Sequence, residues 1–264
     1  MNFTETVLLG AIAGFTIFLG LPIARLRNPS RHWQVFLNAL ATGILLFLLW
    51  DVLSKATEPI NNALSEVQQG EDSFGFIMLL VLFAVGFGVG LLSLVYFERM
   101  FIRRTAQETG GGEATAVQLA LMIATGIGLH NFSEGLAIGQ SSREGAIGLA
   151  TILIIGFGLH NATEGFGIAG PLAAGERPSW AFLGLAGLIG GGPTFLGTML
   201  GYSVHSEEVF VLFLALAAGS IFYVVSELLH VGRRFGLREL AMWGVFSGFL
   251  SGYGTDLFLT WGGA

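Results

Sequence analysis

The chain contains no cysteine and very little charge. Only 11% of its 264 residues are charged, whereas 53% are hydrophobic. A soluble domain of this size usually has about a quarter of its residues charged. So few charges cannot cover a water-facing surface, but a lipid-facing surface needs none. The composition predicts a protein embedded in a lipid bilayer, and the missing cysteines exclude disulfides and thiolate metal sites.

Basic residues are also scarce. The net charge is −6 and no basic stripe runs along the chain, which excludes nucleic acid as a partner. The apolar run at 7–24 has no positively charged stretch before it and no small-residue cleavage site after it. It is therefore predicted to be the first membrane helix and not a signal peptide.

Long apolar runs fill most of the sequence. A membrane-spanning helix needs about 20 mainly apolar residues, and eight such runs occur with short polar connections between them. We predict an all-α membrane protein in which residues 1–264 form one integral-membrane domain with eight transmembrane helices. The predicted spans are 5–25, 33–54, 74–97, 115–139, 146–170, 179–202, 207–230 and 238–260, with an acidic connection at 55–73 and a cytoplasmic loop at 98–114.

The basic residues predict an orientation. If eight helices alternate through the membrane, ten arginines fall on one side, and only Lys55 and Arg143 fall on the other. Cytoplasmic loops of membrane proteins carry an excess of Lys and Arg. The arginine-rich side is therefore predicted to be cytoplasmic, with both termini outside. The compact length favours a prokaryotic inner membrane.

One sequence, G-x-G-L-H-N-x-x-E-G, occurs at 126–135 in the fourth span and again at 156–165 in the fifth. His and Glu four residues apart lie on one face of a helix, with Asn beside them. If the two helices pack with these faces together, two imidazoles and two carboxylates surround one cation. Such a set suits zinc, and also iron, manganese, cobalt, nickel or cadmium. The candidate metal ligands are His130, Asn131, Glu134, His160, Asn161 and Glu164.

Ionisable residues at mid-membrane favour a functional interpretation. Each costs a few kcal/mol on insertion scales and usually marks a pathway or a site. The alternative is that these side chains satisfy one another in a buried hydrogen-bonded network. The same constellation on two helices favours a metal site.

These two motifs resemble those of the ZIP (Zrt/Irt-like protein) family of divalent metal transporters, bacterial type. The resemblance implies an eight-helix bundle with inverted repeats, transport of zinc or a similar ion toward the cytoplasm, and the six motif residues as its ligands. Ser133 and Thr163 stand where family members commonly have proline. In the sixth span, 190–193 reads Gly-Gly-Gly-Pro, so the carboxylate expected for a second metal ion is missing.

Three further carboxylates are candidate pathway residues. Asp51 is expected near the outer end of the second span, where it would line the entrance. Glu227 and Asp256, in the seventh and eighth spans, are expected to serve the cytoplasmic exit or a proton route. The alternative is that all three are interfacial carboxylates paired with arginine or water.

Two other functions stay open beside transport. An intramembrane metalloenzyme would use the same ligands, but helical di-iron sites use Glu-x-x-His spacing, and no H-E-x-x-H or G-x-S-x-G motif occurs. A metal-responsive receptor would need larger loops to relay a signal. We therefore predict a transporter and not an enzyme, with metal ions and the bilayer as partners and a homodimer left open.

Overall fold

The computed structural model describes residues 1–25, 30–97, 116–143, 147–172, 177–204, 206–234 and 236–262. These residues form helices, and no strand occurs among them. The predicted all-α class is confirmed. The predicted cytoplasmic loop at 98–114 lies outside the described ranges.

Each of the eight predicted spans is helical. The elements are α1 (Phe3–Phe15), α2 (Ile17–Gly20), η1 (Leu21–Arg25), α3 (Arg31–Gln68), α4 (Phe74–Phe97), α6 (Ala116–Arg143), α7 (Ile147–Leu172), α8 (Trp180–Ser203), α9 (Glu207–Arg234) and α10 (Arg238–Gly262). The first predicted span is broken at Thr16, where α1 ends and α2 begins.

Six helical segments within the described parts of the chain are long and apolar enough to cross a membrane. They are Phe3–Arg25, Arg31–Gln68, Phe74–Tyr96, Ala116–Gln140, Trp180–Ser203 and Glu207–Ser226. Helices α7 and α10 are not in this set. The apolar segments agree with an integral membrane protein, since a lipid-facing surface requires no charge.

Local sequence explains where several helices begin. Asn2 accepts a hydrogen bond from the backbone N–H of Glu5, whose side chain in turn accepts from the N–H of Asn2, so α1 starts with a capping box. Ser30 and Ser179 cap α3 and α8 in the same way, each accepting from the N–H three residues on.

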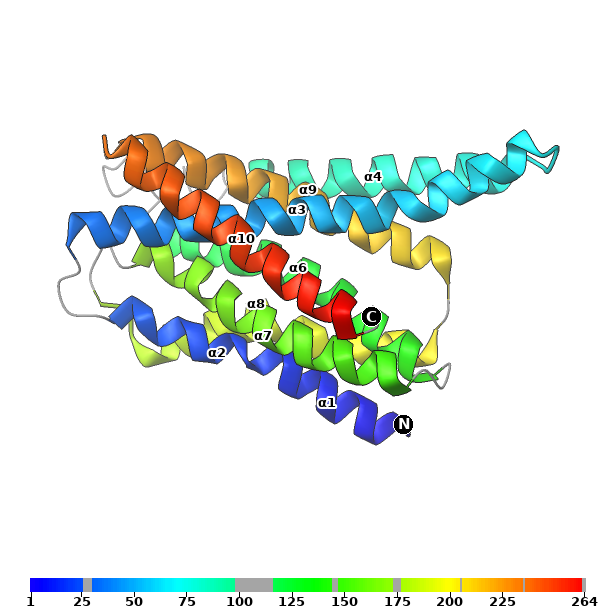
Figure 1. The fold of residues 1–264 in the computed structure, drawn as a ribbon, viewed down its shortest axis with the longest axis horizontal. Helices are drawn as coiled ribbons and strands as arrows, with labels where there is room; N and C mark the ends of the chain where they lie inside the picture. Colours follow the sequence, from blue (N-terminus) through cyan, green and yellow to red (C-terminus); the bar gives the residue numbers. More distant parts are fainter. Residues whose placement is uncertain are drawn as a thin grey trace.

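The helices pack as two groups that run along a common axis (Figure 1). In one group, α3 packs on α10 and α4 packs on α9; in the other, α6 packs on α8, and α1 and α2 lie against α7 and α8. A continuous apolar core joins the groups and includes Ile17, Leu45, Ile123, Ile168 and Ile221. Both termini lie at the same end of the bundle.

Helix α3 corrects the predicted boundary of the second span. The span was expected to end near 54 and to be followed by a connection, but the helix continues for 38 residues to Gln68 with Pro59 inside it. At 1.5 Å per residue its length is about 57 Å, well beyond an apolar bilayer core of about 30 Å. The extension is stabilised because Ile60 packs against Leu79 and Val211. Figure 1 shows it projecting past the bundle beside the start of α4.

Candidate metal centre

The first motif sits on α6, which is held against α8 by very close backbone packing. A Cβ atom at Gly135 would overlap with the backbone oxygen of Thr194, and one at Gly197 would overlap with that of Phe132. Glycine is needed at both positions because the two backbones touch. This contact fixes the depth and rotation of the first motif relative to α8.

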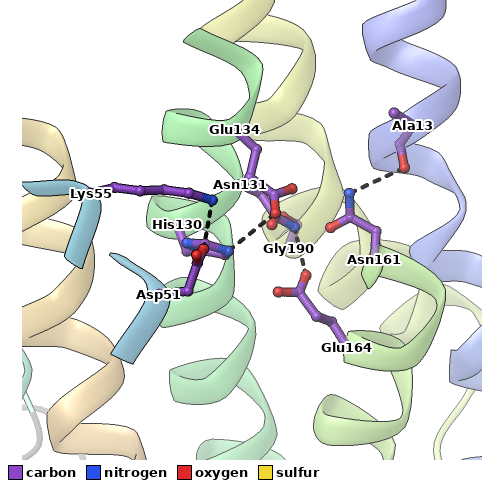
Figure 2. Close-up of polar contacts among 9 residues, drawn as sticks. All are labelled: Ala13, Asp51, Lys55, His130, Asn131, Glu134, Asn161, Glu164 and Gly190. Carbon is purple, nitrogen blue, oxygen red and sulfur yellow. Dashed lines mark hydrogen bonds and ion pairs between the residues drawn. The ribbon is translucent and has the colours of Figure 1, made fainter. Parts of the chain in front are cut away.

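The side chains of the first motif are buried and engage both their own helix and its neighbours. His130 is 2% exposed, and its Nε2 lies 3.2 Å from Oε1 of Glu134. Asn131 Nδ2 donates to Glu164 Oε2 of the second motif at 3.0 Å and to the backbone oxygen of Gly190 on α8 at 3.0 Å. Figure 2 shows these contacts bringing α6, α7 and α8 together. The expectation that the two motif helices face each other is therefore met by Asn131 and Glu164.

The second motif sits on α7, beside the break in the first span. Glu164 is 1% exposed. Asn161 is fully buried, and its Nδ2 donates to the backbone oxygen of Ala13, three residues before the break, at 3.2 Å (Figure 2). The side chain of His160 lies outside the described residues. Among the side chains that are described, no group of three or more His, Cys, Asp or Glu residues is positioned to hold a metal ion.

Three buried oxygens at this site have no hydrogen-bond donor among the described residues: Oδ1 of Asn131, Oε2 of Glu134 and Oδ1 of Asn161. A buried acceptor without a partner costs free energy. In both asparagines the Nδ2 group is bonded elsewhere, which leaves the oxygen as the free atom. Carboxylate and carboxamide oxygens are cation ligands, so the arrangement has capacity for a bound ion.

A cavity of about 260 Å³ leads to the first motif. His130, Ser133 and Glu134 line one wall, and Asp51, Lys55 and Glu58 of α3 line another. The side chains of Lys55 and Glu58 were not among the predicted site residues. A signal for them was present, because 51, 55 and 58 follow the i, i+4, i+7 spacing of one helical face.

Two backbone groups at the site were also not predicted. The oxygen of Gly190 holds the amide of Asn131, and the oxygen of Ala13 holds that of Asn161. Gly190 belongs to the Gly-Gly-Gly-Pro stretch that lacks the expected carboxylate. Every residue carries a backbone oxygen, so sequence offers no signal for this role.

The predicted pathway residues separate into two outcomes. Asp51 forms an ion pair with Lys55, with 2.7 Å between Oδ2 and Nζ. Asp256 interacts electrostatically with both of these residues. Helix α10 runs alongside α3 in the same direction, so the two aspartates lie toward one end of the bundle. The role expected for Asp256, at the cytoplasmic exit or in a proton route, stays a prediction. The side chain of Glu227 lies outside the described residues.

No protein-family model matches this chain, and no curated protein matches it.

Proposed function

We propose that this protein carries divalent transition-metal ions, zinc foremost, across a membrane through the site between α6 and α7. The observation that carries the proposal is the buried contact of Asn131 with Glu164, which joins two copies of one motif around unpaired oxygen atoms. In a hydrogen-bonded network with a purely structural role, buried oxygen atoms are normally paired with donors. A cation supplies what these oxygens lack.

The proposed ligands are His130 and Glu134 on α6 and His160 and Glu164 on α7, with the oxygens of Asn131 and Asn161 completing the site. Two carboxylates balance the charge of a divalent ion, which matters because an uncompensated charge is costly where water is excluded. The ion enters through the cavity beside α3, sheds most of its water, binds, and leaves toward the opposite end.

The proposal includes eight membrane spans in a ZIP-like arrangement with inverted repeats, placed in a prokaryotic inner membrane. Its support is that all eight apolar runs are helical. The arginine-rich side is proposed to be cytoplasmic. In agreement, η1 ends and α3 and α10 begin at the end of the bundle opposite both termini (Figure 1), and Arg25, Arg31 and Arg238 are the residues at these helix ends.

The two helix groups supply parts that move relative to each other. Close glycine packing joins α6 to α8, and similar packing joins α10 to α3. Between the groups, the described residues share a continuous apolar core. We propose that the group holding the motifs shifts against the other and exposes the metal to each side in turn.

Uptake of radioactive zinc into sealed liposomes that contain the purified protein tests this function. The parent protein is expected to take up zinc, and a double variant, Glu134→Ala with Glu164→Ala, is expected to take up none. The matched control is Glu66→Ala with Glu71→Ala, which removes two exposed carboxylates outside the site and should transport like the parent. Absence of uptake by the parent, for zinc and the other candidate metals, would reject the proposal.

A further inference from the structure

Lys55 is the only lysine in the chain, and it lines the cavity that leads to the candidate metal centre. A fixed positive charge in this position is unexpected, because it repels an incoming metal ion. A lysine whose only role is to be solvated at the protein surface would be expected in the loops, together with the arginines. Its place opposite His130 and Glu134 therefore calls for a physical explanation (Figure 2).

Lys55 is paired with one carboxylate of its own helix and has a second carboxylate on the neighbouring helix nearby. Its Nζ lies 2.7 Å from Asp51 Oδ2, and the two side chains are 44% and 16% exposed. The second carboxylate is Asp256 of α10, which interacts electrostatically with both Asp51 and Lys55. The cavity lining thus holds Asp51 and Glu58 beside the Lys55 ammonium group, with Asp256 of the neighbouring helix near Asp51.

The packing of α10 on α3 explains why Asp256 arrives there. Cβ positions at Gly244, Gly248 and Gly252 face Ala39, Leu40 and Phe47 of α3 in turn. The rings of Phe47 and Tyr253 lie 6.1 Å apart, centroid to centroid. One turn further along both helices, Asp256 reaches the level of Asp51, since residues four apart share a helical face.

The inner part of the same cavity has room for a ligand. Ser133 and Glu134 line it and are 2% and 6% exposed. Within the described structure, Ser133 Oγ and Glu134 Oε2 have no hydrogen-bond partner. A cation passing Asp51 therefore meets unpaired oxygens next.

We propose that Lys55 is a tethered cation that occupies Asp51 at the mouth, with Asp256 on the adjacent helix turn beside it, and that a divalent metal ion must displace it to reach the motif site. The inference rests on the proposed transport function. A divalent ion attracts two carboxylates more strongly than an ammonium does, whereas a monovalent ion has no such advantage. Lys55 thereby acts as a selectivity residue, since only an ion of higher charge displaces it.

The chemistry of a single lysine permits a direct test in the intact protein. An amine-reactive ester labels only Lys55 and the N-terminal amine, and mass spectrometry of the peptides separates the two. The ion pair with Asp51 restrains the Lys55 amine, and displacement by zinc frees it to react, so zinc should raise its labelling rate by about two- to fivefold, the range expected for loss of one exposed ion pair. In Asp51→Asn the rate should be high without zinc and should not respond to it. An unchanged or lower rate with zinc in the parent overturns the proposal.

Uptake measurements separate this inference from the transport function. Lys55→Met should lower the zinc concentration for half-maximal uptake by about two- to fivefold, because the competing charge is gone. Arg143→Gln is the matched control. It removes a positive charge at the same end of the bundle, where Arg143 donates to the backbone oxygens of Tyr202 and Ser203 outside the cavity, and its half-maximal concentration should equal that of the parent. Zinc uptake with no shift in Lys55→Met rejects the role of Lys55 alone; no uptake by the parent rejects transport, while the labelling result still decides whether zinc displaces Lys55.

Discussion

The two copies of the G-x-G-L-H-N-x-x-E-G sequence lie in different surroundings. On α6, the asparagine of the motif bonds across to α7 and to the backbone of α8. On α7, the corresponding asparagine bonds to the backbone of α1 at a break in the helix. The first copy faces a continuous helix packed closely against it, and the second faces an interrupted one.

The difference arises from the neighbours and not from the motif. Both asparagines use their amide N–H groups on a backbone oxygen and retain an unpaired Oδ1. Only Asn131 also holds a carboxylate of the opposite motif, Glu164. The two copies therefore supply the same candidate ligands. The packing of the helices determines that Asn131, and not Asn161, holds a glutamate of the other copy.

The largest effect is expected when either motif loses its carboxylate. Glu164→Gln and Glu134→Gln each keep the shape of the side chain and remove the negative charge that balances the metal ion. We expect each to lower zinc uptake by about 100-fold or more, beyond the losses typical of groups that support a ligand. Uptake into liposomes measures this, with Glu66→Gln as the control. If one variant transports normally, the site belongs to a single motif and the pairing of the two copies is rejected.

The asparagines test the asymmetry between the copies. Asn131→Ala removes a candidate ligand and also releases Glu164, so metal affinity should fall by about 10- to 100-fold. Asn161→Ala removes a candidate ligand but leaves both glutamates held, so the loss should be smaller. Titration of the purified variants with zinc measures both affinities. Equal losses would indicate that the bond from Asn131 to Glu164 does not position the carboxylate.

Corresponding glycines sharpen the comparison at the level of packing. A Cβ atom at Gly128 on α6 would overlap with the backbone oxygen of Ile189 on α8. At the equivalent Gly158 on α7, the nearest atom is Thr16 Cγ2 at 3.6 Å, an ordinary contact. Gly128→Ala should therefore push α6 away from α8 and lower the melting temperature, whereas Gly158→Ala should be neutral or slightly stabilising, because alanine favours a helix by about 1 kcal/mol over glycine.

Thermal unfolding in detergent, followed by circular dichroism, compares the two glycine variants. A similar drop in melting temperature for both would show that the two motif helices are packed equally tightly. That result would remove the structural contrast between the copies.

Apolar runs and the repeated motif were enough to predict the helices and the candidate ligands. All eight runs are helical in their described residues, and six of the helical segments are long and apolar enough to cross a membrane. The end of the second span was not predictable, because Ile60 extends α3 by packing on α4 and α9, a tertiary contact. Pro59 within that extension would have argued for an end to the helix.

The motif side chains of the candidate site could be proposed from the sequence, whereas its backbone groups and the cavity that leads to it could not. Asn131 and Glu164 were named as ligands from spacing, and they meet in the structure. The oxygens of Gly190 and Ala13 depend on which helix packs beside each motif. Asp256 lies near Asp51 because α10 packs alongside α3 in the same direction. The residue type of Asp256 gives no information about this packing.

The smallest expected effect concerns the break in the first span. Thr16 Oγ1 lies 2.5 Å from the backbone oxygen of Gly158 and 2.7 Å from that of Ala13, so its single hydroxyl proton is shared between the two acceptors. Thr16 and Asn161 therefore share one acceptor, Ala13, and together hold the break against α7. Thr16→Val keeps the shape of the side chain, removes these bonds and should cost about 1 kcal/mol of stability.

Combining Thr16→Val with Asn161→Ala should cost more than the sum of the two single changes. With either partner present, the oxygen of Ala13 keeps one side-chain donor, but the double variant removes both. Residues that share a partner couple by about 0.5 kcal/mol or more, whereas independent sites add. A double-mutant cycle of unfolding free energies measures the coupling. If the two changes are simply additive, other contacts hold the break in the first span. The second motif would then differ from the first in its neighbouring helix but not in the way its asparagine stabilises the contact with that helix.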